Sequence, residues 1–130
     1  MDFTKYSAYE LKIAFAKSLK ELRIYAGFSL VDLEKLTGIN NPSLSRYENG
    51  RVEPSLSQAI IIADLFNLSV EDFVIYGLNE KVENTDSETI IERFNEKIAN
   101  IVLEMGDNAK NLLQQVYTKI NIEEIIKDYS

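Results

Sequence analysis

The sequence predicts an all-α protein, with five helices in its first part and a helical hairpin at its C-terminal end. Apolar residues recur at helical spacing, as Leu11, Phe15, Leu19 and Leu22 do, and this period of about 3.6 residues is typical of a helix with one buried face. Polar residues that favour helix N-termini precede these segments, and glycine follows several of them. Together the periodicity and the end signals favour short helices joined by tight turns.

Five segments of the first part carry such signals. A side-chain oxygen at the N-cap accepts a hydrogen bond from a backbone amide that the helix leaves free, and an acid or amide three residues later can return the bond. The expected starts are Ser7 with Glu10, Ser29 with Asp32, Asn41 before Pro42, Ser55 with Gln58, and Ser69 with Asp72. The expected ends are Ala26 before Gly27, Gly38, the pair Asn49-Gly50, Phe66 and Tyr76.

The composition argues against several classes of function. At 130 residues the chain suffices for one domain, or for one small domain with an appendage. Because it contains neither cysteine nor histidine, it lacks disulfides, thiolate metal ligands and the commonest general base. We therefore expect no enzyme and no cofactor. No apolar run is long enough to span a bilayer and no signal-peptide pattern opens the chain, so we expect a cytoplasmic protein without a membrane partner.

The net charge of −7 is unevenly distributed along the chain. Residues 1–79 hold 8 Lys and Arg against 10 Asp and Glu, whereas residues 80–130 hold 6 against 11. An acidic protein is an unusual partner for nucleic acid. Most of the excess acid lies in the last part, however, so the first part can still present a basic face.

This change in charge coincides with an expected boundary. Residues 80–85 are polar and charged, which is typical of a linker between a domain over residues 1–79 and an acidic helical tail over residues 86–130. Thr85 is expected to cap the first tail helix and Gly106 to end it. The apolar faces of the two tail helices comprise Ile90, Ile91, Phe94, Ile98, Ile101, Val102 and Met105, then Leu112, Leu113, Val116, Tyr117 and Ile120.

Two amphipathic helices cannot bury both apolar faces against each other and need a further surface. The first part has aliphatic and aromatic residues beyond those its own core needs, namely Tyr9, Ile13, Ile24, Ile60, Ile61 and Leu65. Two explanations stay open. The tail dimerises the protein or binds a partner, which we favour, or it packs onto its own domain.

The segment GINNPSLSRYENGRVEPS, residues 38–55, has little apolar content. Only Leu44 and Tyr47 can anchor its helix in a core, so its polar side chains must face something other than the protein interior. A short helix, a turn around Gly38 and a second short helix make the helix-turn-helix arrangement, whose second helix enters the major groove of DNA.

The chain between Phe15 and Tyr76 resembles the lambda-repressor-like helix-turn-helix family, also called Cro-type or XRE. The matching residues, at the spacing of the family, are Gly27, Ser29, Leu33, Gly38, Ile39, the run LSRYENG over residues 44–50, Pro54 and Ser55. This resemblance covers about half of the chain.

The resemblance implies a DNA-binding site on the third helix and just beyond it. The implied contact residues are Asn40, Asn41, Ser43, Ser45, Arg46 and Arg51. An asparagine amide can pair with adenine and an arginine with guanine, which suits Asn41 and Arg46. Ser43 and Arg51 resemble phosphate contacts. The alternatives are that Asn41 is only a helix cap and that Arg46 is an ordinary solvated arginine.

The resemblance also implies a buried ion pair between Arg23 on the first helix and Glu48 on the third, with a surface pair as the alternative. Three residues depart from the family pattern. Leu30 replaces a glutamine that bonds the DNA backbone, and Pro42 replaces a residue that often donates to bases. Glu34 replaces a tightly packed alanine, so its side chain must bend outward or change the angle between the two helices.

The function implied is that of a sequence-specific transcriptional regulator, a homodimeric repressor on a palindromic operator in double-stranded DNA. A mobile-element repressor fits, and so does an antitoxin that regulates its own gene and binds a protein partner through the acidic tail. The alternative is a protein-interaction module whose helix-turn-helix has lost tight DNA binding. Leu30, Glu34 and the acidic composition favour this alternative.

Overall fold

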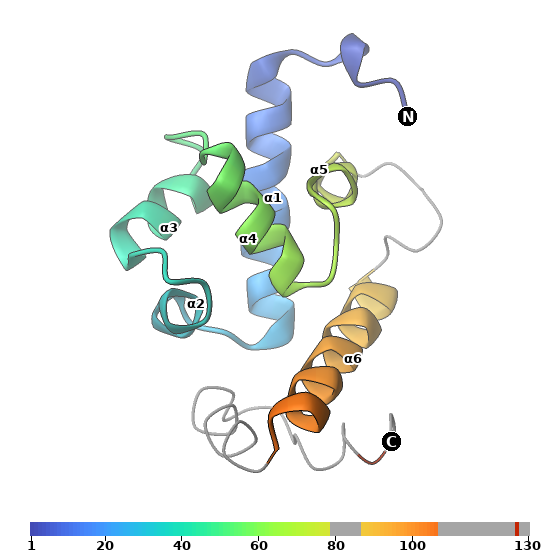
Figure 1. The fold of residues 1–130 in the computed structure, drawn as a ribbon. Helices are drawn as coiled ribbons and strands as arrows, with labels where there is room; N and C mark the ends of the chain where they lie inside the picture. Colours follow the sequence, from blue (N-terminus) through green and yellow to red (C-terminus); the bar gives the residue numbers. More distant parts are fainter. Residues whose placement is uncertain (79–86, 107–126, 128–130) are drawn as a thin grey trace.

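The computed structural model describes residues 1–78, 87–106 and 127. Every regular element in these ranges is helical (Figure 1). The elements are the 3₁₀-helix η1 (Phe3–Lys5) and the α-helices α1 (Ala8–Ala26), α2 (Leu30–Thr37), α3 (Asn41–Glu48), α4 (Leu56–Leu65), α5 (Val70–Gly77) and α6 (Ser87–Met105). The prediction of an all-α fold is confirmed.

The N-terminal caps of four helices form as expected. Ser7 and Glu10 exchange hydrogen bonds in a two-way capping box at α1, and Ser29 and Asp32 do the same at α2. The hydroxyls of two further serines accept the amides of Gln58 and Asp72 at the starts of α4 and α5. Each bond satisfies an amide that the helix itself leaves free, which is why these helices start where the sequence predicts.

The start of α3 differs from the expectation by one residue. The N-cap is Asn40, not Asn41, because Asn40 has an extended backbone and its Oδ1 accepts the Ser43 amide at 2.8 Å. The Asn40 carbonyl also accepts the first helical bond, from Leu44. Asn41 is therefore the first helical residue, and the interpretation of Asn41 as a cap was wrong. Pro42 follows within the first turn, where its missing amide costs no hydrogen bond.

The short helix η1 was not expected from the sequence. Asp2 caps it by accepting hydrogen bonds from both the amide and the hydroxyl of Thr4, and these bonds hold the pKa of the Asp2 carboxyl below its usual value. With one turn and no buried residue, η1 has no apolar periodicity by which the sequence could indicate it.

The core lies among α1, α4 and α5, with α2 and α3 on one side. The eight residues expected there are all buried, namely Phe15, Leu19, Leu22, Leu33, Leu44, Ile62, Phe66 and Phe73. Phe66 packs against Phe73 with ring centroids 6.1 Å apart, and Phe73 packs against Phe15 at 4.8 Å. This aromatic chain joins the three central helices.

α1 and α5 pack with their backbones in close approach. A Cβ atom added to Gly77 would lie 1.8 Å from the backbone oxygen of Ala14, so only glycine fits there. The buried hydroxyl of Ser18 donates to the backbone oxygen of Phe73 in the same contact. The contact fixes α5 against α1 and leaves the opposite side of α1 to α3.

The first tail helix, α6, packs onto its own domain on the side away from α3 (Figure 1). Phe94 and Ile98 are buried in the common core, and the Phe94 ring lies 5.3 Å from that of Phe28 and 5.9 Å from that of Phe66. Lys97 donates to Asp64 Oδ2 at 2.6 Å. For this helix the structure favours packing within one chain. The expected cap Thr85 and the expected second tail helix lie outside the described residues.

The surplus apolar residues of the first part lie on the surface, as expected. Tyr9, Ile13, Ile24, Ile60 and Ile61 are exposed, whereas Leu65 is half-buried against the core. Leu56 on α4, which was not in the expected set, is the most exposed of the large apolar residues that the structure describes, at 75%. Among the described helices, none combines the length and apolar character that a bilayer crossing needs.

Candidate nucleic-acid interface

α2, a turn and α3 form a unit that presents α3 at the surface (Figure 1). Gly38 ends α2 with φ +74°, in the left-handed region that glycine adopts without strain. Ile39 then turns inward and is buried, and its amide donates to Thr37 Oγ1 at 3.2 Å. On α3, Leu44 and Tyr47 are buried. The remaining α3 side chains therefore face outward or lie beside the contact that Leu44 and Tyr47 make with the core.

Tyr47 also ties α3 to α4, because its hydroxyl donates to the side-chain oxygen of Gln58. This bond and the buried Leu44 fix the rotation of α3 about its own axis. The direction in which the polar side chains point is thus set by the core.

The most exposed stripe of α3 and its C-cap comprises Pro42, Arg46 and Asn49, which are spaced by four and three residues. Asn41 and Ser45 lie at one flank of this stripe and Ser43 at the other, and all three are half-buried. Arg46 lies at the centre of this stripe and is exposed. Asn41 lies toward α2, because its amide donates to Glu34 Oε1 on that helix.

Arg51 lies in the loop beyond α3 and is exposed. Its amide donates to the Arg46 carbonyl at 3.0 Å, which closes the C-terminal end of the helix. Gly50 has φ +70°, and a Cβ there would lie 2.7 Å from Ile13 Cδ1 on α1. The loop is therefore held against α1 directly after the end of α3.

Two predicted contact residues already use part of their bonding capacity within the protein. The Asn40 Oδ1 caps α3, so the amide NH₂ is the part of this side chain left to act as a donor. Ser45 Oγ accepts from Asn49 Nδ2 at 3.4 Å. Asn49 was not among the predicted contacts, although its spacing of three residues from Arg46 places it on the same exposed stripe.

Arg23 and Glu48 form a two-point ion pair between α1 and the end of α3. Arg23 Nε lies 2.9 Å from Glu48 Oε2, and Arg23 Nη2 lies 2.6 Å from Glu48 Oε1. The side chains are 16% and 7% exposed, so the pair is largely buried. Arg23 Nη1 also donates to the Phe28 carbonyl at 2.9 Å. The pair holds the C-terminal end of α3 to the scaffold, while Leu44 holds its middle.

The structure shows the positions of two residues that depart from the family pattern, Leu30 and Glu34. Leu30 is half-buried and packs against the core, so it offers no hydrogen bond to a DNA backbone. Glu34 is also half-buried, and its Oε1 accepts the Asn41 amide at 3.1 Å. Of the two outcomes expected for Glu34, a side chain bent outward or a changed angle between α2 and α3, the structure shows a side chain that is bent but stays half-buried. It turns along the surface to the start of α3.

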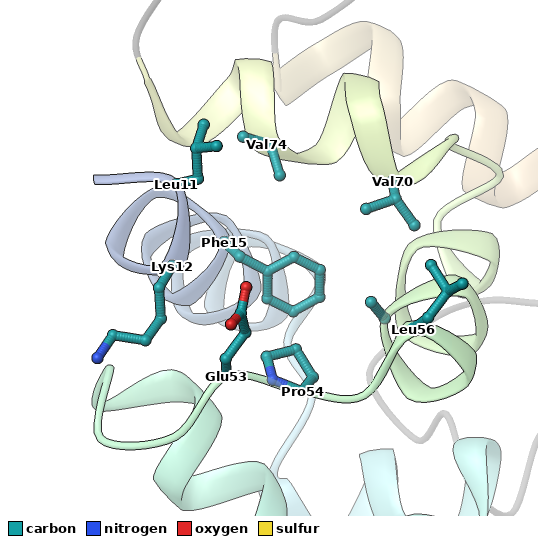
Figure 2. A pocket seen from close by; sticks show the side chains of 9 residues that line it. Leu11, Lys12, Phe15, Glu53, Pro54, Leu56, Val70 and Val74 are labelled. Carbon is teal, nitrogen blue, oxygen red and sulfur yellow. The ribbon is translucent and has the colours of Figure 1, made fainter. Parts of the chain in front are cut away.

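An open pocket of about 360 Å³ lies between α1, α4, α5 and the loop that follows α3 (Figure 2). Its apolar lining residues are Leu11, Phe15, Pro54, Leu56, Ala59, Val70 and Val74. Its charged ones are Lys12, which points away from Phe15, and Glu53.

Several proteins similar in sequence to this chain are named as HTH-type transcriptional regulators. The profile of the helix-turn-helix family matches residues 19–73. An HTH-type transcriptional regulator of Methanocaldococcus jannaschii is 34% identical over 62 residues, which are 48% of this chain and 94% of that protein. The chain belongs to the lambda-repressor-like helix-turn-helix family.

Other members of the helix-turn-helix family match more of the chain at lower identity. The prophage-derived HTH-type transcriptional regulator YonR of Bacillus subtilis is 27% identical over 81% of this chain and 94% of its own length. A protein of Saccharolobus islandicus, named as an HTH-type transcriptional regulatory protein, is 29% identical over 85% of this chain. The match covers only 35% of that longer protein. No solved structure matches the chain.

Proposed function

We propose that this protein is a sequence-specific DNA-binding transcriptional regulator that inserts α3 into the major groove. The observation that carries the proposal is the exposed stripe of α3 around Arg46, which the buried Leu44 and Tyr47 hold outward. Helix-turn-helix proteins read base edges with a short helix whose apolar face is packed in the core and whose polar face is exposed.

Within this proposal the side chains divide into two kinds of contact. Arg46 and Asn41 read base edges, because a guanidinium and an amide can each bond a base in two places. Arg51, beyond the helix end, and Ser43, on the flank, bond phosphates and fix the register. Asn40 and Ser45 contribute donors at the edge of the interface.

We further propose that the protein acts as a homodimer on a palindromic operator, because two recognition helices reach half-sites about one helical turn apart. Leu56 and Ile60, one turn apart and exposed on α4, supply apolar surface for such an interface. A mobile-element repressor is one fitting role, since one relative is described as prophage-derived. An autoregulating antitoxin, with its protein partner on the acidic tail, is the other.

A protein-interaction module that no longer binds DNA is the second candidate function. Two observations favour it. Leu30 packs against the core where a DNA-backbone contact would be made, and Glu34 brings a carboxylate to the start of α3.

A gel-shift titration with DNA from upstream of the gene of this protein separates the two candidates. The regulator should retard that DNA in the presence of competitor, and the affinity should fall with salt with a log–log slope of about −0.9 per neutralised phosphate. If no DNA is retarded even at low salt, the interaction-module function replaces the regulator.

A further inference from the structure

The first turn of α3 has all its backbone amides bonded within the protein. The Asn41 amide donates to Glu34 Oε1 at 3.1 Å, and the Ser43 amide donates to Asn40 Oδ1 at 2.8 Å. Pro42 has no amide to donate. The Leu44 amide begins the helical ladder by donating to the Asn40 carbonyl at 3.1 Å. No amide of this turn is left for an external acceptor.

This closure matters because a helix N-terminus normally attracts anions. Its free amides point outward and its dipole is positive, so phosphates bind there readily. At α3 the place of such an anion is taken by the carboxylate of Glu34, which reaches over from α2. The negative charge lies beside Asn41 and the cap Asn40, at the edge of the surface that we propose to face DNA.

We propose that Glu34 has two effects on this surface: it positions the first turn of α3, and it keeps DNA phosphates away from the Asn41 side of that turn, opposite the flank of Ser43. The proposal rests on the proposed function. A fixed carboxylate repels the phosphate backbone, which every DNA sequence presents alike, whereas the bonds that Arg46 and Asn41 make to base edges form only on the correct bases. Glu34 therefore lowers the backbone part of the affinity, which binding to any DNA sequence shares, and leaves discrimination between sequences to the side chains.

The two effects are separated by two substitutions. Glu34→Gln keeps a side-chain oxygen that can accept the Asn41 amide but removes the charge. Glu34→Ala removes both. Glu71→Gln is the matched control, because Glu71 is an exposed acid on α5, on the other side of α1 from α3, and its loss changes the net charge by the same amount.

The measurement is the affinity of each full-length variant for mixed-sequence duplex DNA and for the retarded upstream DNA, at about 50 mM and about 300 mM salt. Glu34→Gln should bind mixed-sequence DNA about three- to fivefold more tightly than Glu71→Gln at low salt. The difference should shrink at high salt, because counterions screen the repulsion. The affinity for the upstream DNA should rise by a similar factor, because both duplexes present the same backbone, so the ratio of specific to non-specific affinity should stay about the same.

Hydrogen exchange of the Asn41 amide tests the positioning effect without DNA. This amide should stay protected in Glu34→Gln and exchange faster in Glu34→Ala, while the amides of the core helices stay protected in both. Equal protection of the Asn41 amide in all variants would overturn the positioning role.

The DNA results separate this proposal from the proposed function. If the wild type binds its upstream DNA and Glu34→Gln equals Glu71→Gln on mixed-sequence DNA, the repulsion by Glu34 is refuted and the regulator stands. If the wild type fails to bind but Glu34→Gln binds, the repulsion is supported. If neither binds at low salt, both proposals are contradicted.

Discussion

At the scale of single residues, Arg46 and Arg51 are both exposed arginines but lie at different places relative to α3. Arg46 is on its exposed stripe and Arg51 is in the loop beyond. Arg46→Ala should cost about 1–3 kcal/mol of operator binding and relax the base preference at one position in each half-site. Arg51→Ala should weaken binding to all sequences alike and reduce the salt slope by about one phosphate.

Titrations of both variants against operators with single base changes check this difference. An Arg46→Ala protein with unchanged affinity and unchanged base preference would show that the exposed stripe of α3 is not the reading surface. The shared stripe would then no longer be a reason to expect that Asn49 contacts DNA.

The Arg23–Glu48 pair gives a second prediction at this scale. With the Glu48 side chain only 7% exposed, Glu48→Ala leaves the Arg23 guanidinium largely buried with the Phe28 carbonyl as its remaining acceptor. The free energy of unfolding should fall by about 3 kcal/mol, because an unpaired buried charge is costly. Urea denaturation of the variant measures the loss.

The control is the double replacement Arg23→Met with Glu48→Leu. Because it removes both charges and leaves apolar side chains of similar size, it should be less destabilised than Glu48→Ala alone. A double variant that is less stable than the single one would mean that the pair stabilises the fold more than its burial suggests.

At the scale of elements, the α1–α5 contact depends on Gly77. Gly77→Ala should destabilise the protein by several kcal/mol although alanine is the better helix former by about 1 kcal/mol, because the new Cβ would meet the Ala14 carbonyl at 1.8 Å and push α5 away. Thermal unfolding followed by circular dichroism checks this expectation.

Gly38→Ala is the comparison. Gly38 has φ +74°, with no atom within 4 Å of an added Cβ, so only backbone strain of about 1–2 kcal/mol is expected. If the two substitutions cost the same, the close approach of α1 and α5 is not what makes Gly77 necessary.

The helix starts show which structural features can be predicted from the sequence alone. Cap signals at Ser7, Ser29, Ser55 and Ser69 predict four helix starts because each is a local bond between residues three apart. At α3 the start was misplaced by one residue, because Asn40 and Asn41 are both good caps before proline and only the backbone conformation decides between them.

Part of the candidate site was predictable because it, too, depends on residues close together in the chain. The positions of Arg46 and Arg51 relative to α3 follow from local spacing. The bond from the Asn41 amide to Glu34 was not foreseen, because it joins two helices and depends on the angle of the turn between them. That any of these residues contacts DNA stays a prediction.

At the scale of the whole molecule, α6 completes the core of the domain that precedes it. Phe94→Ala should lower the free energy of unfolding by about 3–5 kcal/mol, because it opens a cavity beside the rings of Phe28 and Phe66. Leu103→Ala, at an exposed site on the same helix, should change it by less than about 0.5 kcal/mol. Equal effects of the two substitutions would contradict the packing of α6 on this core.

A chain that ends at Leu78 extends this test to dimerisation. It keeps the residues of the five-helix core but loses Phe94, so it should be less stable than the full chain. If the tail also dimerises the protein, light scattering should show that the truncated chain is a monomer. Operator affinity should then fall steeply, because the two protein copies that bind the two half-sites are no longer linked to each other. A truncated chain that stays dimeric with full affinity would contradict a dimerising tail.

The placement of α6 could not be derived from its sequence. Its apolar face indicates that something covers it, but Phe94 and Ile98 would be equally buried against a second copy or another protein. The contact with Phe28 and Phe66 links positions far apart in the chain, and no local signal encodes it.

The most direct test of the central claim is to map the DNA contact surface by nuclear magnetic resonance. Isotope-labelled protein is titrated with a short duplex from the upstream DNA, and the amide shifts are followed residue by residue. We expect the largest changes at Asn41, Ser45, Arg46 and Arg51 and small ones at Glu71 on α5 and Leu103 on α6. Changes confined to α5 or α6, or none at low salt, would contradict the account of α3 as a DNA-reading helix.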